Sequence, residues 1–129
     1  MQKNLGRISE HQLLILDGLW DRGEATAREV HEALEPRTGH ARKTTGTLLH
    51  RLEKQGVITH EEEGREYVYR ACVTREEVQQ ATVRGVVGQL FPGEVPALIS
   101  YALEAGDVRP EDLARIRALI DAYPKRGRR

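Results

Sequence analysis

The fold is decided by residues 41–70, which read ARKTTGTLLHRLEKQGVITHEEEGREYVYR. Leucines recur at helical spacing in the first half of this stretch, and Gly56 follows them as a C-terminal stop signal. From Val57 the apolar period changes to two, and a β-branched and aromatic run returns after a turn at Gly64. The stretch therefore predicts a helix over about 41–55 that leads directly into a β-hairpin.

Two more helices are predicted upstream of this stretch. Ser9 and Thr26 each stand three residues before a Gln or a Glu, which is a capping-box pattern that opens a helix. Gly23 is expected to end the first of these helices, and Pro36 to end the second. Three helices followed by a two-stranded hairpin is the order of a winged helix-turn-helix domain, in which residues 24–25 would add one short strand.

Downstream of the hairpin, three short helices with wide apolar faces are predicted. A subdomain of this size has difficulty burying so much apolar surface alone, so we expect it to pack against a second copy of the chain. Packing back onto the first domain stays open as the alternative. The predicted fold is mainly α with a small β-hairpin, comprising an N-terminal winged helix DNA-binding domain at 1–73 and a C-terminal helical dimerisation domain at 74–129. The expected dimer contacts are Val86, Leu90, Leu98, Ile99, Leu103, Ile116, Leu119 and Ile120.

The face of the 41–55 helix that lies opposite its leucines is basic. The chain has no net charge, with 20 Lys and Arg against 20 Asp and Glu, but a nucleic-acid surface needs only a local basic patch. Hydroxyls and long cations on one helix face suit the DNA major groove, and Arg65 at the hairpin tip suits a phosphate or the minor groove. Gly46 is unfavourable in a helix interior and indicates close approach of another molecule. The candidate DNA-binding residues are Arg42, Lys43, Thr44, Thr45, Thr47, His50, Arg51, Lys54 and Arg65.

The sequence does not favour an enzyme. Its histidines form no HxxxH or HxH pair, and no Asp or Glu recurs with them at ligand spacing. We therefore expect no catalytic residue, no metal site, no cofactor and no small-molecule substrate. The acidic run at 61–63, together with Glu66, would repel phosphate if it faced DNA. A winged helix that binds another protein, without direct DNA binding, is therefore the alternative function.

Cys72 is the single cysteine, so one chain can form neither an internal disulfide nor a cysteine-rich zinc site. We expect it to be a buried structural thiol in a reducing compartment. The longest apolar run near the start covers residues 13–16, far short of the roughly 20 residues that span a bilayer. These features predict a cytoplasmic protein.

Three short motifs follow one another in the middle of the chain. They are Lys43-Thr44-Thr45-x-Thr47-x-Leu49-x-Arg51-Leu52, then Lys54-x-Gly56, then Gly64-Arg65-x-Tyr67-x-Tyr69. In this order and spacing they resemble the penicillinase-repressor family, BlaI/MecI/CopY. The resemblance covers nearly the whole chain, because residues 8–10 and 19–20 fit the first helix of that family and residues 110–112 fit its final dimerisation helix.

The resemblance implies a transcriptional repressor that acts as a homodimer and binds a palindromic operator in double-stranded DNA through the third helix and the wing. In the β-lactam branch of the family, a membrane-bound sensor metalloprotease releases the repressor by cutting an Asn-Phe bond in the dimerisation region. The matching segment here reads Ser100-Tyr101-Ala102-Leu103, so a sensor protease is an expected partner with no assigned cleavage bond. The copper branch binds metal through a C-terminal cysteine cluster, which this chain lacks, so copper sensing is not expected.

Overall fold

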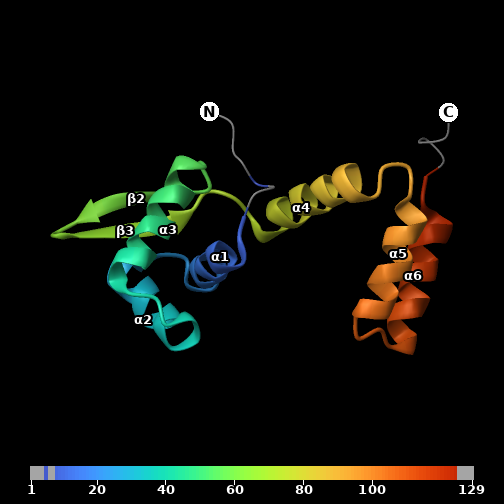
Figure 1. The fold of residues 1–129 in the computed structure, drawn as a ribbon, viewed down its shortest axis with the longest axis horizontal. Coiled ribbons are helices and arrows are strands. Elements are labelled where there is room, and N and C mark those ends of the chain that lie inside the picture. The colour runs from blue at the N-terminus through green and yellow to red at the C-terminus, as the bar shows by residue number, and fades with distance from the viewer. Residues whose placement is uncertain (1–4, 6–7, 125–129) are drawn as a thin grey trace. The chain divides into compact units, whose positions relative to one another are not determined.

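The structure is a computed structural model that describes residue 5 and residues 8–124 (Figure 1). Two compact units divide between Val86 and Val87, inside the fourth helix. The elements in chain order are α1 (Glu10–Arg22), β1 (Ala25–Thr26), α2 (Ala27–Thr38), α3 (Arg42–Lys54), β2 (Ile58–Glu63), β3 (Glu66–Ala71), α4 (Arg75–Leu90), α5 (Val95–Ala105) and α6 (Pro110–Ala122).

The first unit, Met1–Val86, is a winged helix and is called the winged-helix unit below. Helices α1, α2 and α3 precede the hairpin of β2 and β3, and β1 pairs with β3. The resulting sheet is antiparallel, with the strand order β1-β3-β2. The prediction of a mainly α-helical chain with a winged helix is therefore confirmed. The short additional strand covers Ala25–Thr26, one residue later than the sequence predicted.

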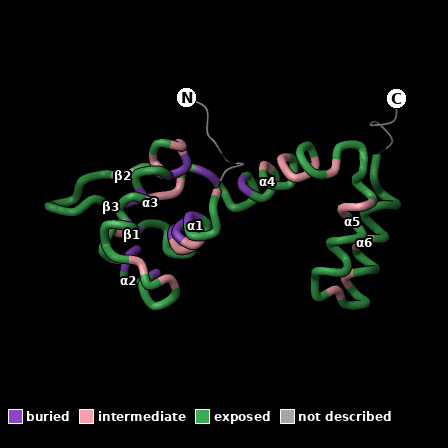
Figure 2. Tube along the Cα trace, viewed as in Figure 1, coloured by how far each residue is buried: buried purple, intermediate pink, exposed green. Residues whose placement is uncertain are grey.

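The core of the winged-helix unit lies between the three helices and the sheet. Leu16 of α1 and Leu52 of α3 are both fully buried, and Val57 is buried with them at the entrance to the hairpin. Figure 2 shows the buried positions concentrated on the elements of this unit. Because α1 and α3 bury one face each in the same core, their remaining faces are left at the surface.

The start of α4 belongs to this core, so the winged-helix unit extends past residue 73. Val73 and Val78 are each 5% exposed and pack in the same cluster. Trp20 Nε1 donates a hydrogen bond of 2.8 Å to the carbonyl of Val73. The guanidinium of Arg75 lies over the Trp20 ring, 4.9 Å from its centroid, and 3.3 Å from the Asp17 carboxylate. These contacts hold the first part of α4 to α1.

The prediction that Pro36 ends α2 is wrong. The helix continues to Thr38, and Gly39 follows in the left-handed conformation, with its N–H donating to the carbonyl of Glu35. A proline removes one N–H donor and crowds the preceding turn, but its own φ is helical. In the last turn of a helix the loss is small, and here the Thr38 hydroxyl donates a bond of 3.1 Å to the carbonyl of Leu34.

The expectation of a buried thiol is also wrong, because Cys72 is exposed. It follows directly after β3, where successive side chains point to opposite sides of the chain. Val73 takes the inward position next to it and is buried in the core. A free cysteine is commonly buried, but at this point the alternation of the extended chain decides which residue faces inward.

The second unit, Val87–Arg129, contains the end of α4 together with α5 and α6. Within the single chain, neither α5 nor α6 buries any residue completely. The rings of Phe91 and Tyr101 contact each other with their centroids 6.0 Å apart.

No single helix in the described part of the chain is long and apolar enough to cross a bilayer. Only α4 and α5 together, as a bent pair, reach that length and composition.

The capping boxes predicted at Ser9 and Thr26 are both present. In the second, Glu29 accepts a bond of 2.9 Å from the backbone N–H of Thr26 and lies 3.2 Å from the Arg22 guanidinium. The N–H of Thr26, foremost, and the charge of Arg22 hold the pKa of Glu29 below its ordinary value of 4.5. The charged form of Glu29 therefore contributes stability above that value.

We predict that this contribution is lost as the pH falls through the lowered pKa of Glu29 in the folded protein. Glu29→Gln keeps an acceptor for the Thr26 N–H but does not titrate. The free energy of unfolding should therefore fall less steeply between about pH 5 and pH 3 in this variant than in the wild type. Urea titrations at several pH values measure both curves, and parallel curves would contradict the assignment.

Candidate nucleic-acid interface

Helix α3 has one buried face and one exposed face. Leu49 and Leu52 are buried at 1% and 0% exposure, and Leu48 is half-buried at the edge of the core. The opposite side carries cations and hydroxyls, and we call it the basic face. Its exposed members are Arg42, Lys43, Thr44, Thr47, His50, Arg51 and Lys54.

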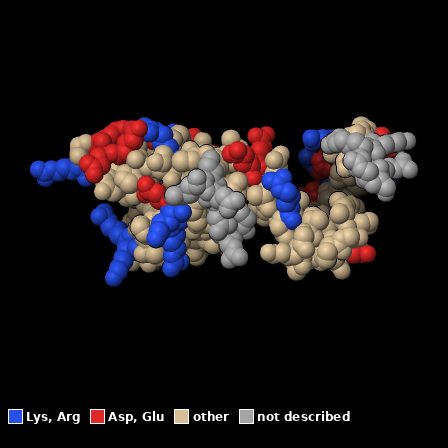
Figure 3. Space-filling model, turned by 90° about the horizontal axis from the view of Figure 1, so that it is seen from above, with Lys and Arg blue, Asp and Glu red and all other residues tan. Residues whose placement is uncertain are grey.

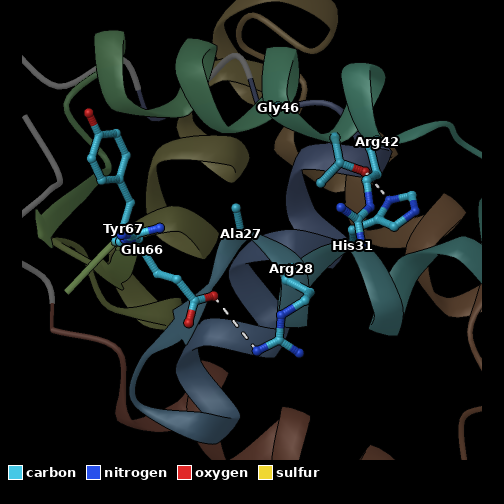
Figure 4. A pocket seen from close by; sticks show the side chains of 9 residues that line it. Ala27, Arg28, His31, Arg42, Gly46, Glu66 and Tyr67 are labelled. Carbon is cyan, nitrogen blue, oxygen red and sulfur yellow. Dashed lines mark hydrogen bonds and ion pairs between the residues drawn. The ribbon is translucent and has the colours of Figure 1, made fainter. Parts of the chain in front are cut away.

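Thr45 is not part of the basic face, and its assignment to the DNA-binding set is corrected. It is 2% exposed, and its hydroxyl lies 3.0 Å from Nδ1 of His31, which is itself buried (Figure 4). The physical reason is helical spacing, since Thr45 stands four residues before Leu49 and seven before Leu52. It therefore continues the buried stripe of α3. The same spacing is visible in the sequence.

The N-terminus of α3 carries no side-chain cap, as expected from the alanine at its N-cap position. Ala41 offers no hydrogen-bonding side chain, and the first turn contains no acidic residue. The first backbone N–H groups of a helix lack intrahelical acceptors, and the helix dipole favours an anion there. With the exposed side chains of Arg42 and Lys43 beside it, this end of the helix is suited to a phosphate.

The wing tip presents a cation, and farther along the wing one carboxylate is paired within the chain. Gly64 turns the hairpin at φ +66°, a conformation that favours glycine, and Arg65 next to it is exposed. Arg70 lies 3.3 Å from Glu61 and 2.9 Å from Glu24. Hydrogen bonds to these two carboxylates, Glu24 first, raise the pKa of Arg70. In Figure 3 several Lys and Arg side chains project from one edge of the winged-helix unit, and its densest acidic cluster lies toward the other.

The single acidic residue of α3 is turned toward the wing. Glu53 lies 2.7 Å from Nδ1 of His60 on β2, and the His60 ring stacks on Tyr67 of β3 with centroids 4.1 Å apart. Burial, and then the charge of Glu53, raise the pKa of Tyr69 beside this cluster. The contacts tie α3 to the base of the wing, and they keep the Glu53 carboxylate occupied away from the basic face.

Sequence reasoning missed a hollow of about 580 Å³ between α2, α3 and the wing, and with it the part that α2 and the start of β3 take in its lining. Arg28 and His31 enter it from α2, and Glu66 and Tyr67 enter it from the start of β3 (Figure 4). Two signals were available in the sequence. Arg28 lies in the first turn of α2, and His31 precedes the buried Leu34 by about one helical turn. In the described part of the chain, no three His, Cys, Asp or Glu side chains are grouped to hold a metal ion.

A winged helix with a basic third helix and a cation at the wing tip defines a class, the winged-helix proteins that bind DNA. The family model described as the penicillinase repressor matches residues 8–122. The chain therefore belongs to the penicillinase repressor family, which is a family of transcriptional repressors and not of enzymes.

Named relatives agree with this assignment along most of their length. The penicillinase repressor of Bacillus licheniformis is 22% identical over 96% of this chain and 97% of that protein. The transcriptional regulator BlaI of Mycobacterium tuberculosis is 28% identical over 92% of this chain and 88% of its own length. The solution structure of the DNA-binding domain of the repressor BlaI matches with a TM-score of 0.54 and 29% identity, covering 59% of this chain and 93% of that domain.

We predict that Thr45→Val destabilises the protein, because it leaves the buried Nδ1 of His31 without its hydroxyl partner. The loss should be about 1–3 kcal/mol in the free energy of unfolding. Thr44→Val makes the same chemical change at the neighbouring exposed position and should cost less than about 0.5 kcal/mol. Chemical denaturation of both variants measures the difference. Equal stabilities would mean that the bond between His31 and Thr45 contributes nothing.

Proposed function

We propose that this chain is a sequence-specific transcriptional repressor that binds a palindromic operator in double-stranded DNA as a homodimer. The observation that carries the proposal is the division of α3 into a buried apolar face and an exposed basic face, next to a wing with a cation at its tip. The basic face would enter the major groove, where Lys43 and Arg51 would contact phosphates or guanine edges. Arg65 would contact the adjacent backbone or minor groove.

The second half of the proposal is dimerisation through α4, α5 and α6. Of the eight residues expected in this contact, Leu90, Leu119 and Ile120 are 72%, 70% and 64% exposed in the single chain. Ile99 and Leu103 are also exposed. Val86, Leu98 and Ile116 are half-buried. So much unburied apolar surface on three helices favours a two-fold partner that covers it.

Two dimer-related α3 helices would then lie on half-sites separated by about 10 base pairs or a multiple of this spacing. Such a repressor acts where the chromosome is, which is the basis for proposing a cytoplasmic location. A membrane-bound sensor protease that releases the repressor is part of the same proposal. It rests on family membership, and the matching segment Ser100-Tyr101-Ala102-Leu103 assigns no cleavage bond.

A winged helix that binds only protein remains the competing function. Its support in the sequence was the acidic wing, and in the structure Glu61 and Glu66 are each paired with an arginine. Salt dependence separates the two functions, because DNA binding should weaken linearly on a plot of log affinity against log salt. The operator itself can be found by sequencing the duplexes that the protein selects from a random pool.

We predict that Lys43→Ala and Arg51→Ala each weaken binding to the selected duplex by roughly fivefold to a hundredfold. Both side chains are exposed, so the melting temperature should change little. Gel shift and thermal melting measure the two properties on the same samples. Unchanged affinity in both variants would remove α3 from the interface.

We also predict that Leu119→Glu converts the dimer to a monomer and weakens binding to the full operator. Leu119 is 70% exposed in the single chain, so the charge disturbs a subunit contact and not the fold. Ala118→Glu, which adds the same charge at an exposed position about 200° around α6 from both Ile116 and Ile120, is the control that should stay dimeric. Light scattering gives the mass of each variant. A monomeric wild type would contradict the proposal.

A further inference from the structure

The hollow between α2, α3 and the wing is lined by more cationic than acidic side chains. Arg28, Arg42 and Arg65 line it, and they come from three separate elements of the winged-helix unit. Among the described residues that line it, Glu66 is the only acidic one. Two carboxylates, Glu66 and Glu32, lie beside Arg28. Three arginines against these two carboxylates still leave a positive balance that favours a further anion.

Gly46 gives a second and independent indication of a ligand. It lies in the middle of α3, lines the same hollow, and is less favourable in a helix than alanine. No described atom lies within 4 Å of the place where its Cβ would stand, so no neighbour in the described chain requires a glycine. Lack of a side chain there leaves room for a molecule from outside to approach the backbone of α3.

We propose that this hollow binds one phosphodiester group of the DNA backbone, with Arg28, Arg42 and Arg65 as its cationic ligands. The inference rests on the proposed function and adds α2 to the DNA contacts. A phosphodiester fits better than a small diffusible anion because the hollow is open to solvent between the basic face and the wing tip, where the DNA backbone would pass.

Within this site, the Glu66 carboxylate competes with the phosphate for the Arg28 guanidinium. Its carboxylate lies 3.7 Å from the Arg28 guanidinium, which also lies 3.7 Å from Glu32 (Figure 4). The side chains of this pair are 51% and 48% exposed, and ion pairs so exposed are weak. A phosphate can therefore replace Glu66 as the partner of Arg28. The carboxylate then remains nearby and lowers the affinity for DNA.

The test is a double-mutant cycle on the full-length protein with the duplex selected from the random pool. Arg28→Ala should weaken binding roughly fivefold and reduce the salt slope by about one unit. Glu66→Gln should tighten binding roughly threefold or more, because it removes the competitor and keeps the side-chain shape. In the Arg28→Ala background, Glu66→Gln should tighten DNA binding no more than a control variant does. That control is Glu62→Gln, which removes a charge from an exposed position of β2 that does not line the hollow.

Three results would overturn the inference. Unchanged affinity of Arg28→Ala would remove Arg28 from the site. A gain from Glu66→Gln equal to that of Glu62→Gln in both backgrounds would reduce Glu66 to general electrostatics. Binding of inorganic phosphate to the free protein, lost in Arg28→Ala while DNA affinity is kept, would identify a small-anion site instead. If the wild type selects no duplex at all, the proposed function fails first, so the two failures are distinguishable.

Discussion

The whole structure of the winged-helix unit depends on the burial of one face of α3. Thr45, Leu49 and Leu52 form the buried stripe, and the helical period then fixes which residues remain outside. The side chain of Thr45 is polar, but its bond to His31 satisfies it and ties α3 to α2. The basic face therefore needs no support of its own. The basic face is exposed to solvent because the opposite face of α3 is held in the core.

A chain without net charge can still present a positive surface, because several of its carboxylates are paired elsewhere. Glu53 is held by His60, and Glu24 and Glu61 are held by Arg70. Of the acidic residues around α3 and the wing, Glu66 is placed where it opposes an anion. Local arrangement, and not total charge, thus decides the electrostatic field that DNA would meet.

The elements of the fold were predictable because their signals are local. The capping boxes at Ser9 and Thr26 and the change of period at Val57 each depend on residues close in sequence. The hollow was not predictable, since Arg28, Arg42 and Arg65 are brought together only by tertiary packing. At Thr45 the hydroxyl side chain suggests a DNA contact, but its spacing of four residues from Leu49 places it on the buried face. At Pro36, one lost hydrogen bond in a last turn was too small a cost to end the helix.

The two units differ in how much of their apolar surface a single chain can bury, and this difference bears on regulation. The winged-helix unit completes its core within one chain, whereas α5 and α6 bury no residue fully on their own. Separation of two subunits would therefore expose apolar surface on the second unit and leave the first unit folded. In the proposed dimer, linked half-site contacts would raise affinity through effective concentration, so losing the link would weaken operator binding without altering the basic face. A signal that acts on α5 or α6 of the proposed dimer would then release DNA without any change in the basic face of α3.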